Sequence, residues 1–142
     1  MLDSARGWAG CILFNKTIKD QFEWYAKQED RFTLGVCNGC QLMSQINYVP
    51  FPLPDRAKQP RFIQNRAGKL ECRVVNVRIE KSKSVLLRGM EGSTLGVWIA
   101  HGEGRCYWPD AAVKAEAERQ GCVAMKYVDN EGNVGSAVGG EA

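Results

Sequence analysis

The first half of the chain alternates between helix-like and strand-like spacings of apolar residues. From Trp8 to Lys27 the apolar side chains recur as on one face of a helix, which predicts a single amphipathic helix. Residues 32–36 (Phe-Thr-Leu-Gly-Val) predict a short buried strand, and residues 38–46 predict a second helix beginning right after Cys37. The prolines at 50, 52 and 54 predict a loop that runs to about Gln59.

The second half has strand-like segments separated by turns. Strands are predicted at residues 70–79, 96–100 and 123–128, with a turn-rich connector at 81–92. Asp110 can cap a helix that continues to Gln120 and is stopped by Gly121. Residues 129–133 predict a hairpin-type turn into a partner strand, for which residues 134–140 are a weak candidate. Helix-linked and hairpin-linked strands together predict an α/β fold with a mixed or antiparallel portion.

Composition narrows the class of protein. The 142 residues fit one domain, and 44% apolar with 25% charged residues is the balance of a globular protein. A net charge of +3 gives no case for binding nucleic acid or a membrane surface. No apolar run approaches the roughly 18 residues of a membrane span. Six cysteines without a secretory signal indicate a reducing compartment. We expect the cytoplasm, or an organelle if a transit segment precedes Met1.

The candidate nucleophile is Cys37, in the run Gly-Val-Cys-Asn-Gly at residues 35–39. A strand that turns sharply into a helix exposes a nucleophile, and Gly35 and Gly39 would let the backbone turn without clashes. Partial positive charge at the helix start favours the thiolate. The N–H of Asn38 could also donate to an oxyanion.

Other roles for the cysteines remain open at this point. Cys37 and Cys40 form C-x-x-C, which also suits a thiol–disulfide oxidoreductase, although such pairs usually carry proline inside. A zinc site would need a second ligand pair, and the remaining cysteines stand singly with one histidine in the chain, so no metal is expected. Both thiols could also be inert core groups.

Residues 34–41 (Leu-Gly-Val-Cys-Asn-Gly-Cys-Gln) resemble the nucleophile motif of class I, triad-type glutamine amidotransferases. They most resemble the glutaminase domains of the phosphoribosylformylglycinamidine synthase family. Further similar segments follow in order at residues 5–9, 14–15, 20–22, 29–32, 60–62, 65–66, 87–93, 100–105 and 127–132. The resemblance therefore extends over about residues 4–133 and implies a flavodoxin-like sheet flanked by helices.

The resemblance implies a reaction and its partners. Cys37 would attack the side-chain amide of glutamine, form a γ-glutamyl thioester and release ammonia. A synthetase domain of the same enzyme, which uses ATP and Mg, would consume the ammonia in purine biosynthesis by converting formylglycinamide ribonucleotide to its amidine. Gly35, Asn38, Gly39 and Gln41 would bind the substrate or the oxyanion. The domain itself would need no cofactor. A non-catalytic amidotransferase-like binding domain is a further alternative.

The catalytic base is less clear from the sequence. His101 is the single histidine, with Glu103 two residues on, so Cys37, His101 and Glu103 form a candidate triad. The family's His and Glu lie in a Pro-His-Pro-Glu-Arg motif, which this sequence lacks. His101 instead resembles a separate His-Gly-Glu-Gly-Arg signature, for which we expect a role in shaping the glutamine pocket or in contacting the synthetase portion.

The family pattern also predicts segments at both ends that the sequence lacks. The family's N-terminal strand and oxyanion loop, and its C-terminal His/Glu segment, have no counterpart in residues 1–142. We therefore expect a single partial glutaminase domain, inactive on its own.

Overall fold

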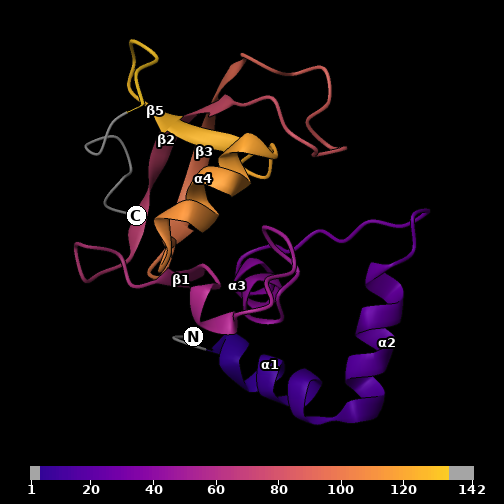
Figure 1. The fold of residues 1–142 in the computed structure, drawn as a ribbon. Coiled ribbons are helices and arrows are strands. Elements are labelled where there is room, and N and C mark those ends of the chain that lie inside the picture. Colours follow the sequence, from indigo (N-terminus) through magenta and orange to yellow (C-terminus); the bar gives the residue numbers. More distant parts are fainter. Residues whose placement is uncertain (1–3, 135–142) are drawn as a thin grey trace.

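The computed structural model describes residues 4–134 and contains four α-helices and two antiparallel sheets (Figure 1). The helices are α1 (Ser4–Phe14), α2 (Lys16–Ala26), α3 (Asn38–Gln45) and α4 (Ala111–Arg119), with a 3-10 turn, η1, at Arg56–Lys58. The strands are β1 (Arg61–Ile63), β2 (Glu71–Ile79), β3 (Thr94–His101), β4 (Arg105–Tyr107) and β5 (Met125–Val128). The predicted α/β class with an antiparallel portion is confirmed. Every strand pair among residues 4–134 is antiparallel.

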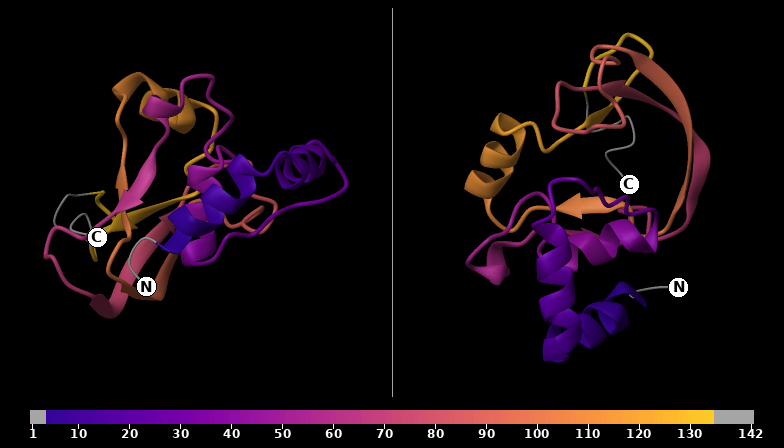
Figure 2. Two further views of the ribbon diagram at one scale, coloured as in Figure 1. Left: turned by 90° about the horizontal axis from the view of Figure 1, so that it is seen from below. Right: turned by 90° about the vertical axis from the view of Figure 1, so that its right-hand side faces the viewer.

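The single helix predicted from Trp8 to Lys27 is wrong, because Asn15 divides it. Asn15 has an extended backbone (φ −105°, ψ 108°), and its side-chain oxygen accepts a hydrogen bond from the Ile18 N–H at 3.2 Å. It is therefore the N-cap of α2, a position that asparagine favours. Figure 2 shows α1 and α2 meeting at an angle. The predicted apolar face is also partly wrong, since the Trp8 side chain is 63% exposed.

Helices α1 and α3 bury an apolar cluster between them. Ala9 and Ile12 of α1 are buried with Ile46, the C-cap of α3. Partly buried side chains surround this cluster: Leu13, Ile18, Phe22, Leu42 and Tyr48. Burial of such side chains typically contributes about 1.5–3 kcal/mol each. The cluster therefore fixes the position of the helix that follows Cys37.

The strand predicted at residues 32–36 is not formed. This segment has no strand assignment, and within residues 4–134 no strand pairs with it. Its apolar side chains are exposed: Phe32 63%, Leu34 63% and Val36 70%. An apolar run becomes a strand only where neighbouring strands satisfy its backbone groups. The segment is apolar as predicted, but the predicted strand is wrong.

The other predicted elements are confirmed with small shifts of their ends. Strand β2 is the centre of the sheet β3–β2–β5, where Val75, Val77 and Ile79 alternate as buried residues. Asp110 is the N-cap of helix α4, and its carboxylate accepts from the Ala112 and Val113 N–H groups. The turn at residues 129–133 closes with Asp129 N–H donating to Asn133 O at 3.0 Å. The partner strand predicted at 134–140 falls almost wholly outside the described residues.

Two connections cross from one sheet to the other, and they lie against each other. Strands β1 and β4 form the two-stranded sheet, in which Ile63 pairs with Arg105. In the larger sheet Glu71 pairs with His101. Residues 64–70 therefore link β1 to β2, and residues 102–104 link β3 to β4. Both segments run between the two sheets at the same end of the paired strands. Asn65 N–H donates to Gly102 O at 2.9 Å between the two connections.

Candidate functional site

The backbone at Cys37 is strained, and the residue is exposed. Cys37 is the N-cap of α3 with φ 55° and ψ −116°, one of two non-glycine residues with positive φ among residues 4–134. Such a conformation typically costs about 1–3 kcal/mol and is retained where the surrounding structure imposes it. The side chain makes no capping hydrogen bond, and the residue is exposed. The predicted elbow is therefore present, although a coil rather than a strand leads into it.

Glycine is required on one side of the elbow only. A Cβ atom at Gly35 would lie 2.4 Å from Met43 Sδ, 2.8 Å from Gly39 O and 2.9 Å from Cys40 N. The chain entering the elbow thus touches the first turn of α3 directly. At Gly39 a Cβ would meet nothing within 4 Å. The expectation that Gly39 prevents a clash is therefore wrong, whereas the same expectation for Gly35 is confirmed.

Helix α3 places the remaining predicted binding residues within its first turns. Asn38 and Gly39 follow Cys37, and Gln41 lies one turn further along. The chain just before α3 accepts two hydrogen bonds from its first turn, from Gly39 N–H to Val36 O and from Cys40 N–H to Cys37 O, at 2.9 and 3.0 Å. The Asn38 Oδ1 atom is buried and has no hydrogen-bond partner among the described residues. This start of a helix beside an exposed thiol can stabilise negative charge.

Cys40 has a different environment from Cys37. It lies in the first turn of α3 and is partly buried; burial, and secondly the neighbouring Cys37, raise the pKa of its thiol. The pKa of Cys106 is also raised by burial, to about 11. That value reflects the protein atoms around the sulfur, although Cys106 as a whole residue is exposed.

We predict that alkylation distinguishes the two thiols of the C-x-x-C pair. A raised pKa means a smaller thiolate fraction at a given pH, and the thiolate is the reactive form. Iodoacetamide at about pH 8 should therefore modify Cys37 well before Cys40. Peptide mass spectrometry over a time course measures both rates in one sample. Modification of Cys40 first would contradict the burial of its thiol.

His101 is the last residue of β3, and Asn65 holds its ring. The Nδ1 atom lies 3.1 Å from Asn65 Oδ1, while Nε2 is buried without a hydrogen-bond partner among the described residues. The ring packs flat on the next turn, since a Cβ at Gly104 would lie 2.3 Å from Nδ1. The contact of Nδ1 is thus with an amide and not with a carboxylate. Within residues 4–134, Cys37 and His101 share no hydrogen bond.

One hydrogen bond connects the His101 loop to the Cys37 helix. Gln41 Nε2 donates to the backbone oxygen of Glu103 at 3.1 Å, across 62 residues of sequence. The structure therefore brings together the two motifs that the sequence singled out. Asn65 was not a predicted site residue, although residues 65–66 belong to the segments that carried the resemblance. Its role depends on the tertiary arrangement and has no local signal.

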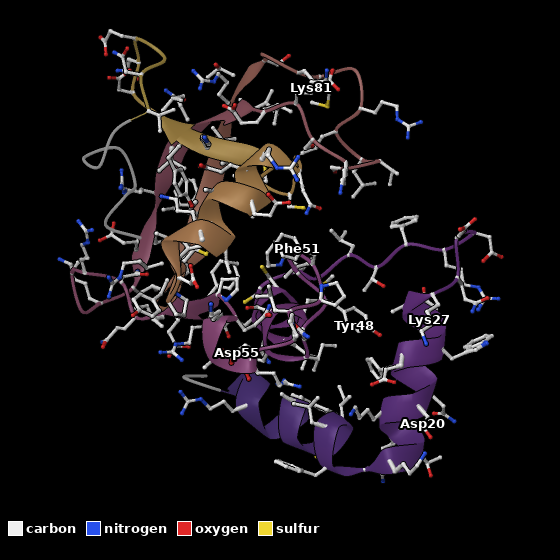
Figure 3. All side chains as sticks on the ribbon, viewed as in Figure 1. Asp20, Lys27, Tyr48, Phe51, Asp55 and Lys81 are labelled. Carbon is white, nitrogen blue, oxygen red and sulfur yellow. The ribbon has the colours of Figure 1, made fainter. Side chains whose placement is uncertain are left out.

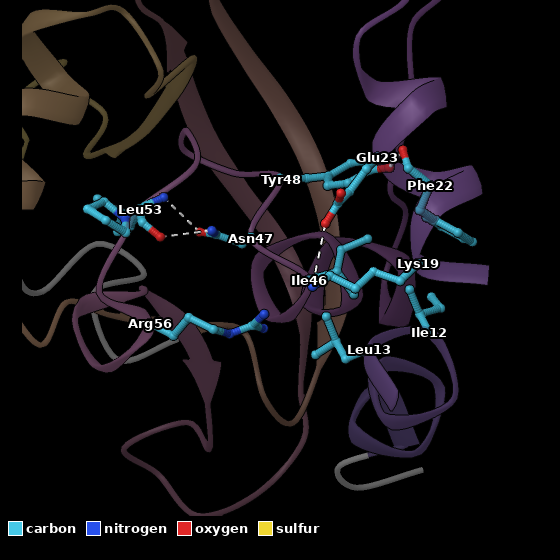
Figure 4. Close-up of a pocket in the computed structure, with 11 residues that line it drawn as sticks. Ile12, Leu13, Lys19, Phe22, Glu23, Ile46, Asn47, Tyr48, Leu53 and Arg56 are labelled. Atoms are coloured by element: carbon cyan, nitrogen blue, oxygen red, sulfur yellow. Dashed lines mark hydrogen bonds and ion pairs between the residues drawn. The ribbon is translucent and has the colours of Figure 1, made fainter. Parts of the chain in front are cut away.

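The pockets beside the helices do not contain the predicted site. The pocket in Figure 4 has a volume of about 250 Å³ and lies between the α1–α2 pair and the segment that follows α3. Its wall includes the Asn47 side chain, which exchanges two hydrogen bonds of 3.0 Å with the Leu53 backbone. A second pocket of about 510 Å³ includes Phe32 and Thr33. Neither Cys37 nor His101 lines either pocket.

The structure also gives two findings on metals and membranes. In the part of the chain from Ser4 to Val134, the side chains of His, Cys, Asp and Glu form no group of three that could hold a metal ion. No helix in that part is long and apolar enough to cross a membrane.

This chain has known relatives. It is 48% identical over 140 residues to a probable phosphoribosylformylglycinamidine synthase, chloroplastic/mitochondrial, of Arabidopsis thaliana, covering 96% of this chain and 10% of that protein. It is 45% identical over 134 residues to the phosphoribosylformylglycinamidine synthase of Dictyostelium discoideum, covering 94% of this chain and 10% of that protein. The chain thus spans about a tenth of these relatives. Residues 1–139 match the family model of the CobB/CobQ-like glutamine amidotransferase domain, and the chain belongs to this family.

Proposed function

We propose that this chain belongs to the glutamine-hydrolysing domain of a phosphoribosylformylglycinamidine synthase, with Cys37 as its nucleophile. The observation that carries the proposal is the strained, exposed Cys37 at the start of α3. The match of residues 1–139 to an amidotransferase family supports glutamine as the substrate. The names of the two relatives support the purine-pathway enzyme. A class I, flavodoxin-like arrangement of the whole domain is part of the same proposal.

The proposed chemistry follows from the elbow. The Cys37 thiolate attacks the carboxamide carbon of glutamine, and the carbonyl oxygen takes up negative charge beside the Asn38 N–H at the start of α3. The amide nitrogen takes up the proton that the thiol gave to a base. The tetrahedral intermediate then expels this nitrogen as ammonia and leaves a γ-glutamyl thioester. Water hydrolyses the thioester to glutamate and regenerates the thiol. The proposal assigns no residue as the base that receives the thiol proton. Within this chain, His101 is the candidate for that role.

The ammonia would pass to a synthetase portion of the same enzyme. There ATP and Mg would activate formylglycinamide ribonucleotide, and ammonia would convert its amide to the amidine. Within this domain the proposal requires no cofactor. The cytoplasm is the expected location; the chloroplastic/mitochondrial name of one relative supports an organelle as the alternative.

A glutamine-like electrophile tests the proposal directly. The γ-diazoketone analogue of glutamine should attach once per chain, at Cys37, and glutamine in excess should slow the attachment. Cys72 is an internal control, because it is another exposed cysteine in the same molecule. A non-specific alkylating reagent should modify both residues. Equal labelling of Cys37 and Cys72 by the analogue, without protection by glutamine, would refute glutamine recognition at this site.

The two alternative functions predict different results. A thiol–disulfide oxidoreductase should show a reversible Cys37–Cys40 disulfide in a redox titration, and no preference for the glutamine analogue. A non-catalytic amidotransferase-like domain should copurify with a synthetase-type partner without any covalent attachment at Cys37.

A further inference from the structure

The Asn65 side chain uses both groups of its amide to bind the His101 loop and the Lys69 backbone. Asn65 is 3% exposed. The amide nitrogen donates to Lys69 O at 3.0 Å and to His101 O at 2.8 Å. The amide oxygen accepts from the Gly104 N–H at 3.1 Å. Turning the amide over would point its NH₂ group at an N–H donor and its oxygen at two carbonyls, so the orientation is fixed by these partners.

The fixed amide determines which nitrogen of His101 carries the proton. Asn65 Oδ1 lies 3.1 Å from His101 Nδ1 and can only accept a hydrogen bond. The neutral imidazole must therefore be protonated on Nδ1, and Nε2 keeps its lone pair. This Nε2 atom is buried and without a partner among residues 4–134. A buried acceptor without a donor costs roughly 1–3 kcal/mol.

The loop that holds this acceptor is attached to the nucleophile helix. Glu103 O accepts from Gln41 on α3, one helical turn from Cys37. The Gly104 position allows the ring to lie on the loop, because a Cβ there would fall 2.6 Å or less from three ring atoms. Ring orientation, protonation and loop position therefore all depend on Asn65 and on the Gln41 contact.

We propose that Asn65 is a positioning residue for glutamine. It holds residues 101–104 against α3 and fixes His101 as the Nδ1–H tautomer, which leaves Nε2 as the acceptor nitrogen of the ring. That the loop at residues 101–104 helps to bind glutamine rests on the proposed function; the tautomer does not.

Nitrogen NMR of the imidazole tests the tautomer without any activity. His101 is the single histidine of the chain, so a ¹⁵N-labelled protein without a histidine tag gives one pair of ring nitrogens. Near pH 8.5, where an ordinary imidazole is neutral, Nδ1 should resonate as the protonated nitrogen and Nε2 as the unprotonated one. The reverse assignment in the unmodified protein would overturn the proposal, and this measurement needs no variant.

Two variants and one matched control separate positioning from folding. Asn65→Ala should lose the Nδ1–H preference, whereas Asn65→Asp keeps an acceptor oxygen and should retain it. Asn47→Ala is the control, since Asn47 also exchanges side-chain hydrogen bonds with a loop backbone but does not contact His101. An unchanged tautomer in Asn65→Ala, or an equal change in Asn47→Ala, would refute the role of Asn65.

The ligand part has its own measurement. Glutamine added to an unreactive Cys37→Ala chain should shift the Nε2 resonance of His101, and glutamate at equal concentration should shift it less. Asn65→Ala, made in the chain that retains Cys37, should slow labelling by the diazoketone analogue by up to about 100-fold while iodoacetamide labelling of Cys37 stays the same. If glutamine shifts the amides of α3 but not His101, the ligand assignment is wrong. If it shifts nothing, the proposed function itself fails.

Discussion

Replacing Cys37 with alanine is expected to abolish covalent attachment of the glutamine analogue, from one adduct per chain to none. No other described cysteine occupies a helix N-cap with positive φ. In an enzyme that joins this domain to its synthetase portion, glutamine-dependent amidation should fall by about four orders of magnitude or more. Amidation supplied with ammonium should persist, because the nucleophile acts only in releasing ammonia. Intact-mass spectrometry and parallel assays with the two nitrogen sources measure these effects.

A second substitution at the same position tests the strain. Cys37→Gly removes the side chain as well, but glycine adopts positive φ without cost. This variant should therefore be more stable than Cys37→Ala by about 1 kcal/mol, and equally unreactive. Continued labelling of either variant would show that another residue is the nucleophile. A Cys37→Gly chain no more stable than Cys37→Ala would show that the backbone at this position is relaxed.

Gly35→Ala is expected to destabilise the elbow strongly, although the change adds one methyl group. Two of the three atoms closest to the added Cβ belong to the backbone, Gly39 O and Cys40 N, and cannot turn aside as the Met43 side chain could. Overpacking of this kind costs about 1–3 kcal/mol. The free energy of unfolding in urea should fall by that amount. Labelling of Cys37 by the glutamine analogue should slow as the start of α3 is displaced.

Gly39→Ala is the matched control for Gly35→Ala. Its Cβ would meet no atom within 4 Å, and the residue lies inside α3. Alanine favours a helix over glycine, so the free energy of unfolding should stay unchanged or rise by up to about 1 kcal/mol. Equal destabilisation by the two substitutions would contradict the packing of residues 35–40. Slower labelling in Gly39→Ala at unchanged stability would instead support the binding role predicted for this position.

The sequence predicted those parts of the fold that depend on local interactions. Capping by Asp110, the turn at residues 129–133 and the helix after Cys37 each rely on neighbours within a few positions. The break at Asn15 was missed because helical periodicity continues through it, although asparagine is a good N-cap. The largest difference between prediction and structure is the segment before Cys37, which begins after Lys27, labelled in Figure 3, and pairs with no strand among residues 4–134.

The candidate site was only half predictable for the same reason. The signal for Cys37 lies close to it in the sequence, in Gly35 two positions earlier and in the helix that follows. The arrangement around His101 depends on Asn65, which is 36 residues distant, and nothing near Asn65 in the sequence indicates that partner. The candidate triad also assumed that Glu103, two residues from His101, would orient the ring. The structure gives that contact to an amide from another connection between the sheets.

The contact between Gln41 and Glu103 has a consequence for the order in which the site is completed during synthesis. The 62 residues that separate them take roughly 3 to 12 s to add at about 5–20 residues per second. Helix α3 can form early, since its contacts with α1 are close in sequence. We therefore expect the nascent chain to carry the Cys37 thiol for several seconds before the loop at residues 101–104 exists to lie beside it.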